Sequence, residues 1–460
     1  MIQNVGFKPN ICINKAQTKV ASTFFGTQKN ATNALKYLNN NPNITFNTTL
    51  SQSEIAKYQY LLNFLKDVKQ TRNSQGLTCA KQLEILLKNG KLLAKSSNDN
   101  STTLDNLYKI AALPRCEKLD SRNLLSSTLD ILVNPKIVSQ NFGDIPQELK
   151  PEILSKLDNN EKVKQDPNLM NVSSSGTCAA ASNEVNLADK YPAEFARWIE
   201  GLSSPQKAVY LDIQLSSLSK NKLDALAILD LLKAQKVKFD FSNVRIKVNT
   251  DKNAYIRAKV QDKYWDFGER NVADVLIQSA IMQLGSQNTY DSLSDTREGD
   301  LNANPQGLVE IEKTFVESLI KNKEITSFIY QKIDDDQNLV GYTCSFEKMQ
   351  KHLIETLDNG DDVIIGYTLT NETAGATKTL SYNPSVDGAP NKVINGHEIT
   401  IVGYSKDLQG NITFLCVDTD DDSPELVKYS AQWLLPKIHH AGYPAKIVEA
   451  DEYEIMSQVA

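Results

Sequence analysis

The chain has very few histidines and no long hydrophobic segment. Only four histidines occur among its 460 residues, so chemistry that needs an imidazole has few candidates. No stretch approaches the roughly 18 uninterrupted apolar residues of a membrane span. Even the most apolar segment, residues 272–285, is broken by Asp274 and two glutamines. The sequence therefore predicts no membrane span.

Basic charge and paired cysteines are also scarce. Lys and Arg total 50 against 56 for Asp and Glu, a net charge of −6, so neither nucleic acid nor an anionic membrane is an expected partner. The six cysteines are scattered without a C-x-x-C pair, which argues against a disulfide framework or a zinc cluster. The first residues lack the basic region and apolar core of a secretory signal. We expect a cytoplasmic protein, or one exported without a conventional signal peptide, with no metal or other cofactor.

Length and polar runs predict the domain organisation. At about 150 residues per domain, a chain of 460 residues holds two or three domains. The polar run at 158–168 is the best boundary, because it joins Asp, Asn and Lys residues to an Asp-Pro-Asn turn. We expect a flexible segment at 1–26, an all-helical domain at 27–157 that is either a propeptide or a partner-binding domain, and a second domain at 158–460.

Hydrophobic periodicity predicts an α+β protein. Ser51 and Glu54 form a capping box ahead of an apolar helical stripe. Beyond the boundary the pattern alternates between helical and strand-like periods. The predicted helices lie at about 51–68, 83–88, 124–133, 146–157, 178–200 with helical segments to 235, 272–284, 307–319 and 346–357. The predicted strands lie at 237–248, 254–267, 363–370, 397–404 and 412–418.

A cysteine stands where a small-residue loop runs into a predicted helix. The loop 171–177 (NVSSSGT) leads to Cys178, and Thr177 or Ser175 is placed to cap the helix. In a first helical turn, unpaired backbone N–H groups and the helix dipole lower the pKa of a thiol, and the same groups can hold an oxyanion. Cys178 is a candidate nucleophile, although a cysteine in this position is more often a small packed residue.

A histidine opens one strand of a predicted hairpin. Gly396 precedes His397, which begins the apolar strand 397–404. The next strand, 412–417, is apolar on both faces, which is typical of a central strand.

The register of this hairpin predicts a partner for the histidine. With a four-residue loop in which Ser405 faces Gly410, Asp418 lies directly opposite His397. A carboxylate there fixes the tautomer and orientation of the imidazole and leaves the other ring nitrogen for a thiol. Asp420 is the substitute if the hairpin slips. The alternative is a packed edge histidine beside a solvated acidic loop.

Together these segments resemble the papain-like cysteine peptidases. In that family a cysteine begins the central helix of a helical left lobe, a histidine opens a strand of an antiparallel β right lobe, and Asn or Asp ends the next strand. Here 175–179 (SGTCA) is similar to the family's CGSCW, and 396–404 (GHEITIVGY) is similar to its HAVxxVGY. Residues 414–418 match the orienting position, and 353–367 resemble the preceding helix and strand. The resemblance covers roughly 165–450.

The chain departs from the family's pattern in three places. The aromatic residue usual after the nucleophile is Ala179. The oxyanion-hole glutamine expected six residues before the cysteine is Val172, and the resemblance makes Asn171 its substitute if the loop carries an extra residue. Cys178 and His397 are 219 residues apart, against about 130–150 in papain-type enzymes, which implies insertions between the lobes.

Other motifs give weaker signals. His439-His440 is more typical of a surface or packing feature than of a base, and His352 lies in an amphipathic helix, where a structural role is expected. The acidic clusters 334–336 and 420–422 lack EF-hand spacing for calcium. Residues 264–267 (YWDF) resemble a transglutaminase strand but have no histidine.

We therefore expect an α+β papain-like catalytic domain after an all-helical domain. The resemblance implies a peptidase that hydrolyses a protein or peptide substrate through a thioester. Cys178 would be the nucleophile, His397 the base and acid, and Asp418 the orienter, with Asn171 and the Cys178 N–H at the oxyanion. The alternatives are glutamine deamidation or transglutamination by the same triad, and a degenerate papain-like binding module.

Overall fold

The computed structural model describes most of the chain after residue 49. The described residues are 50–66, 68, 76–141, 143, 145–156, 164–165, 176–220, 222–240, 242–265, 268–299, 307–370, 391–420 and 425–449. Among them, no helix has both the length and the apolar content needed to cross a bilayer. The described chain is mixed α+β, and every strand pair in its sheets is antiparallel, so the predicted class is confirmed.

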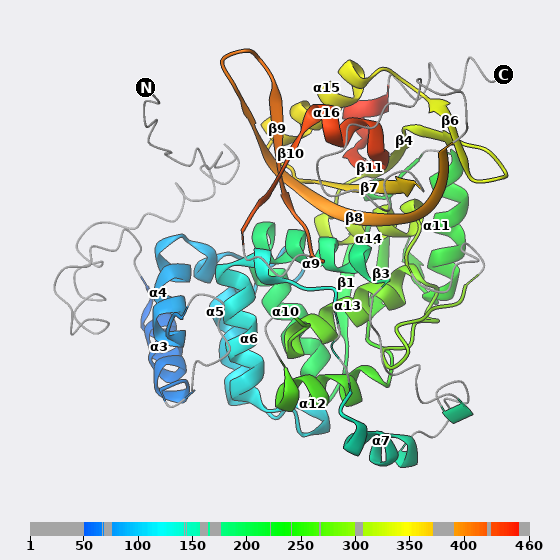
Figure 1. The fold of residues 1–460 in the computed structure, drawn as a ribbon. Helices are drawn as coiled ribbons and strands as arrows, with labels where there is room; N and C mark the ends of the chain where they lie inside the picture. The colour runs from blue at the N-terminus through cyan, green and yellow to red at the C-terminus, as the bar shows by residue number, and fades with distance from the viewer. Residues whose placement is uncertain are drawn as a thin grey trace.

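Most of the helices fill the lower part of the molecule in the view of Figure 1, and the larger sheet lies in the upper part together with α15 and α16. Helices α9 and α14 run where the two parts meet, and both contact the sheet. The helices are α3 (Gln52–Phe64), α4 (Cys79–Lys88), α5 (Thr103–Ala112), α6 (Ser121–Val133), α7 (Lys150–Lys156), α9 (Cys178–Lys190), α10 (Pro192–Ser203), α11 (Lys222–Ala234), α12 (Ala254–Tyr264), α13 (Val272–Gly285), α14 (Glu310–Lys321), α15 (Phe346–Asp358) and α16 (Ala431–Leu434).

The strands form two sheets. A small sheet has the order β1-β3-β2, and the large one has the order β10-β9-β8-β7-β11-β4, with β6 also pairing to β8 and β5 to β6. The strands are β1 (Val209–Gln214), β2 (Lys238–Asp240), β3 (Asn243–Val248), β4 (Ile325–Ile329), β5 (Gln331–Ile333), β6 (Asn338–Tyr342), β7 (Val363–Thr370), β8 (Asn391–Lys406), β9 (Ile412–Val417), β10 (Val427–Ser430) and β11 (Ile438–Pro444).

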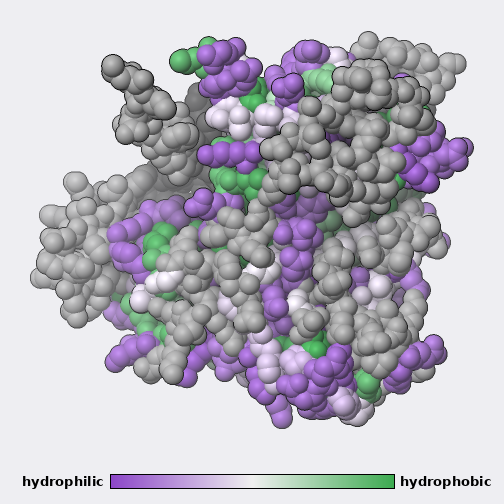
Figure 2. Space-filling view, viewed as in Figure 1, coloured by the Kyte–Doolittle hydropathy of each residue, from purple (hydrophilic) through white to green (hydrophobic). Residues whose placement is uncertain are grey.

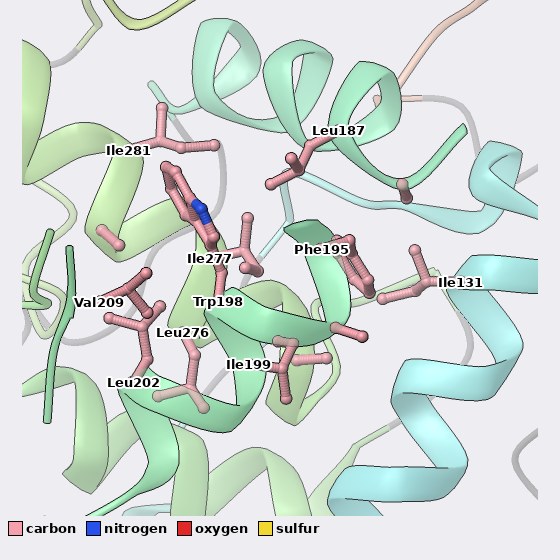
Figure 3. Packing of buried hydrophobic residues seen from close by; sticks show 14 of the residues in the cluster. Ile131, Leu187, Phe195, Trp198, Ile199, Leu202, Val209, Leu276, Ile277 and Ile281 are labelled. Atoms are coloured by element: carbon pink, nitrogen blue, oxygen red, sulfur yellow. The ribbon is translucent and has the colours of Figure 1, made fainter. Parts of the chain in front are cut away.

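The helical core is built around α10 and α13. Every residue of α13 is buried, and the helix begins with a capping box in which Asn271 and Asp274 satisfy each other's backbone N–H groups. Figure 3 shows Trp198 of α10 lying between Ile277 and Ile281 of α13. The indole of Trp198 is 1% exposed, and it is among the largest fully buried side chains of the described residues.

The N-terminal helices share this core. Buried side chains of α3 to α6 belong to the same hydrophobic cluster as those of α9, α10 and α13. The predicted boundary at 158–168 lies almost wholly outside the described residues. The helices before it nevertheless pack directly on those after it, so removing them would expose apolar surface on α10 and α13.

Several predicted elements are confirmed and three are wrong. The capping box of α3, the ends of α4 and α6, and the Ser345-capped α15 lie as predicted. The predicted strand at 254–267 is instead helix α12, because Ala254, Ala258 and Gln261 make a helical stripe against α13. Residues 209–214, expected within a helical region, form β1 with alternate buried side chains. The single helix expected at 178–200 is two, because Pro192 starts α10 at a position where its missing N–H costs nothing.

The described part of the surface is mainly hydrophilic on the face shown in Figure 2, with small apolar patches between the polar residues. The most exposed large apolar side chain is Leu408, at the tip of the β8–β9 hairpin. Leu226 and Leu229 are also exposed, on α11.

Candidate active site

Cys178 is the first residue of α9, as predicted. Thr177 precedes it with φ −94° and ψ 20°, and its side chain makes no capping hydrogen bond, so of the two predicted caps Thr177 is wrong, and Ser175 lies outside the described residues. Its hydroxyl instead accepts from Arg270 and contacts Gln278 Oε1 at 3.4 Å. The Cys178 thiol therefore lies at a helix start where no threonine hydroxyl competes for the first backbone N–H groups.

Residues on either side of α13 hold Gly176 and Thr177, the two described residues directly before the cysteine. The N–H of Gly176 donates to Asp295 Oδ2 at 3.0 Å. The other oxygen of Asp295 accepts from the Tyr290 hydroxyl at 2.5 Å and lies 3.5 Å from the buried guanidinium of Arg270. Because Arg270 also donates to Thr177, a single buried cation fixes both ends of this short turn.

A buried acid pair lies under the same turn. Gln278 Nε2 donates to Glu184 Oε2 at 2.9 Å, which links the turn to the interior of α9. Burial raises the pKa of Glu184 to about 8, and burial together with the neighbouring Glu184 raises the pKa of Asp274 well above its usual value. The pair is therefore largely protonated at neutral pH, and the base of the site carries little negative charge.

Small residues let α9 approach the strand that carries the histidine. Ala179, Ala180 and Ala181 are fully buried, and the Thr400 hydroxyl of β8 donates to the backbone carbonyl of Ser182 at 3.3 Å. Because these three positions are buried, a larger side chain at any of them would displace the elements packed around α9. Ala179, where the family has an aromatic residue, is one of them.

His397 lies in β8 and faces the nucleophile. The strand begins at Asn391, so His397 is within it rather than at its start as predicted. The ring meets Tyr367 of β7 edge-on, with centroids 5.5 Å apart and planes at 90°. Its Nε2 lies 2.7 Å from Asp418 Oδ1, and the Cys178 thiol lies near enough to the ring to raise its pKa. Since Nε2 is taken by Asp418, the nitrogen left for the thiol is Nδ1.

Asp418 is the first residue after β9. Its Oδ2 accepts from the Tyr429 hydroxyl at 3.3 Å, and its Oδ1 accepts from the backbone N–H of Asp420 at 3.2 Å. The Tyr429 ring stacks on Trp433 with centroids 4.6 Å apart, and this aromatic pair covers one side of the carboxylate. Asp418 is therefore the carboxylate that accepts the hydrogen bond of His397, and the backbone N–H of Asp420 supports that carboxylate.

The predicted register is wrong, although the predicted contact is present. The hairpin closes with a loop of five residues instead of four, and after a bulge the last pair of the ladder is Thr400 opposite Val417. Asp418 comes one step later, so His397 is its diagonal neighbour on the same face of the sheet. Diagonal neighbours in an antiparallel pair lie within side-chain reach, which is why the contact forms without direct opposition.

The pKa values of the pair show how the site is charged. Burial alone would lower the pKa of His397, but the hydrogen bond with Asp418 and the nearby Cys178 thiol outweigh burial and raise the pKa well above the usual value. Burial alone would raise the pKa of Asp418, but the bond to His397 holds it below its usual value. The site thus favours an imidazolium between a carboxylate and the thiol.

A non-helical segment before the predicted domain boundary also supports the site. The N–H of Gln140 donates to the Thr419 carbonyl at 3.0 Å, and the Thr419 hydroxyl donates to Gln140 Oε1 at 3.1 Å. Thr419 follows Asp418 directly, so this contact fixes the backbone beside the carboxylate. Sequence reasoning missed Gln140, Arg270 and Asp295, since they are far from the motifs in the chain and carry no pattern of their own.

Four other candidates from the sequence can be placed briefly. Asn171 and Val172 lie outside the described residues. His352 is structural as expected, with Nδ1 2.9 Å from the Tyr330 hydroxyl in an aromatic cluster. Asp334 accepts backbone N–H groups in the β5–β6 turn.

The His439-His440 pair does not lie on an open surface. His440 is buried, and both rings form a cluster with Glu310, described below.

No family model, curated protein or solved structure matches the chain.

Proposed function

We propose that this protein is a papain-like cysteine peptidase that cleaves peptide bonds by acyl transfer. The observation that carries the proposal is the hydrogen bond of the Asp418 carboxylate to Nε2 of His397, together with Cys178, at a helix start, close enough to the same ring to raise its pKa. A thiol, an imidazole and an orienting carboxylate in this order are the parts that thioester chemistry needs.

In the proposed reaction the Cys178 thiolate attacks the carbonyl carbon of the scissile peptide. The oxyanion formed is stabilised by backbone N–H groups at the start of α9, aided by the positive end of its dipole. The Nδ1 proton of His397 passes to the leaving amine, and a thioester remains on Cys178. Neutral His397 then takes a proton from water, the resulting hydroxide adds to the thioester, and the acid leaves as the thiol is regenerated.

Asp418 acts as a positioning residue in this scheme. Its bond to Nε2 selects the imidazole orientation in which Nδ1 faces the thiol, and its charge favours the imidazolium that protonates the amine. Asn171 remains the proposed side-chain donor to the oxyanion.

The test is incubation of the full chain with an unfolded protein such as casein, followed by counting new N-termini. We expect cleavage that is lost in Cys178→Ala and after alkylation, and retained in the matched control Cys344→Ala, a half-buried cysteine of the β6–α15 connection. Ammonia release or amine incorporation without new N-termini would refute the peptidase and leave the triad in use for deamidation or transglutamination. Absence of all three activities in a folded sample would favour the binding module.

A further inference from the structure

A second cluster of ligand-type side chains lies on the large sheet next to α14. Glu310, His439 and His440 each place one potential ligand atom so that the three atoms lie within 4.8 Å of one another. The Nδ1 atoms of the two histidines are 2.9 Å apart, with the rings nearly perpendicular. Two imidazole nitrogens and a carboxylate oxygen are ligands typical of zinc and related divalent transition metals.

The backbone is shaped to bring the two histidines together. Adjacent residues of a regular strand point to opposite faces of the sheet. Here β11 has a bulge against β7 between Ile438 and His440, and a bulge of this kind redirects a side chain. His439 and His440 therefore turn toward each other and toward Glu310 at the start of α14.

The second nitrogen of His440 lies beside a carboxylate. Nε2 is 2.8 Å from Glu398 Oε1, although the angle does not make a hydrogen bond, and the other oxygen of Glu398 is 3.2 Å from the buried ammonium of Lys313. A carboxylate next to the outer nitrogen of a histidine is a common arrangement around a protein-bound metal, and an ion on Nδ1 would leave Nε2 to carry the proton that this carboxylate can accept. Glu398 points away from the face that His397 uses, so this cluster is separate from the candidate active site.

A glycine makes room for the contact. Gly366 of β7 lies between His440 and Glu398 in the sheet, and a Cβ on it would be 2.1 Å from His440 Cε1 and 2.6 Å from Glu398 Oε1. Only a residue without a side chain allows these two groups to meet across the middle strand.

We propose that Glu310, His439 and His440 bind a divalent transition metal ion, with Zn²⁺ as the best fit. The ion would take Nδ1 of each histidine and one carboxylate oxygen of Glu310, with water in the fourth position. It would join the start of α14 to β11, two elements that otherwise meet through packing. This proposal does not depend on the peptidase assignment.

The test is metal titration of the full chain, freed of metal by chelation, in a Cys178→Ala background so that the thiol beside His397 does not compete. With Co²⁺ as the probe, we expect one ion per chain, visible d–d absorption without thiolate charge-transfer bands, and a thermal midpoint that rises with added Zn²⁺. His439→Ala and Glu310→Gln should each weaken binding at least tenfold. The matched control is Glu347→Gln, an exposed acid in the first turn of α15, which should change nothing.

Two results would overturn the proposal. One is the absence of saturable binding at millimolar metal, which would mean that the two histidines only hydrogen-bond to each other. The other is binding that persists unchanged in Glu310→Gln, a nearly isosteric change at a half-buried position that keeps the test valid even if His439→Ala fails to fold.

Discussion

Replacement of Asp418 is the most direct test of how the candidate triad works. The carboxylate makes a 2.7 Å hydrogen bond to His397, and a bond to a charged group contributes about 1.5–3 kcal/mol. If that energy is used in the rate-limiting step, Asp418→Ala lowers kcat/KM by roughly 10- to 100-fold. Asp418→Asn keeps an acceptor oxygen and loses only the charge, so its loss should be smaller.

The pH profile gives the same prediction a direction. The bond to Asp418 and the nearby Cys178 thiol raise the pKa of His397, and activity falls on the alkaline side as the imidazolium deprotonates. Removing the carboxylate lowers that pKa, so the alkaline limb of Asp418→Ala should move to lower pH. The assay is the initial rate of casein cleavage across pH, with the rate of Cys178 alkylation as a readout that needs no substrate.

Asp420→Ala is the matched control for this experiment. Asp420 is exposed and contacts Asp418 through its backbone N–H, which the substitution retains. We expect a change of less than about threefold, in line with a surface substitution of small effect. Equal losses at the two positions would refute the orienting role of Asp418, and a mild effect at both would refute the triad.

Three further predictions concern reactivity and stability. Limiting iodoacetamide should label Cys178 before the half-buried Cys344, as mapped by mass spectrometry; faster labelling of Cys344 would contradict the nucleophile assignment. Burial raises the pKa of Glu184 to about 8, so the folded protein loses stability as pH rises from about 4.5 to 8. Glu184→Gln should therefore add roughly 1–3 kcal/mol to the free energy of unfolding near pH 7 and nothing near pH 4. An equal gain at both pH values in urea titrations would disprove the linkage. Gly366→Ala should cost about 1–3 kcal/mol by overpacking, whereas Gly403→Ala, whose Cβ would find its nearest atom at 3.7 Å, should be tolerated; similar unfolding midpoints for the two variants would exclude the steric argument.

Local signals in the sequence predicted the parts of the fold that depend on neighbours along the chain. The Ser51 capping box, the Ser345 cap and the apolar strands around His397 are short-range patterns, and the structure has them. The strand predicted at 254–267 failed because its aromatic and β-branched residues favour a strand locally, while packing against α13 makes it helical.

The candidate site was predictable only in part for a related reason. The cysteine starts a helix and the aspartate follows a strand, and the histidine lies within a strand whose apolar second half has a readable pattern. The loop length of the β8–β9 hairpin and its bulge are set by backbone geometry that composition does not specify, so the predicted direct opposition of His397 and Asp418 was wrong while their side-chain contact was right. Arg270 and Asp295 act through tertiary contacts alone, and no spacing in the sequence indicates them.

The contact between Gln140 and Thr419 has a consequence for biosynthesis. It joins positions 279 residues apart, and it fixes the chain next to the carboxylate that orients His397. Such a contact forms late in folding, because closing a long loop lowers the conformational entropy of the chain before the contact stabilises the fold. A nascent chain that has not yet reached residue 419 therefore holds its thiol without the acid and base that would activate it, and the activity we propose can arise only after that residue has been made.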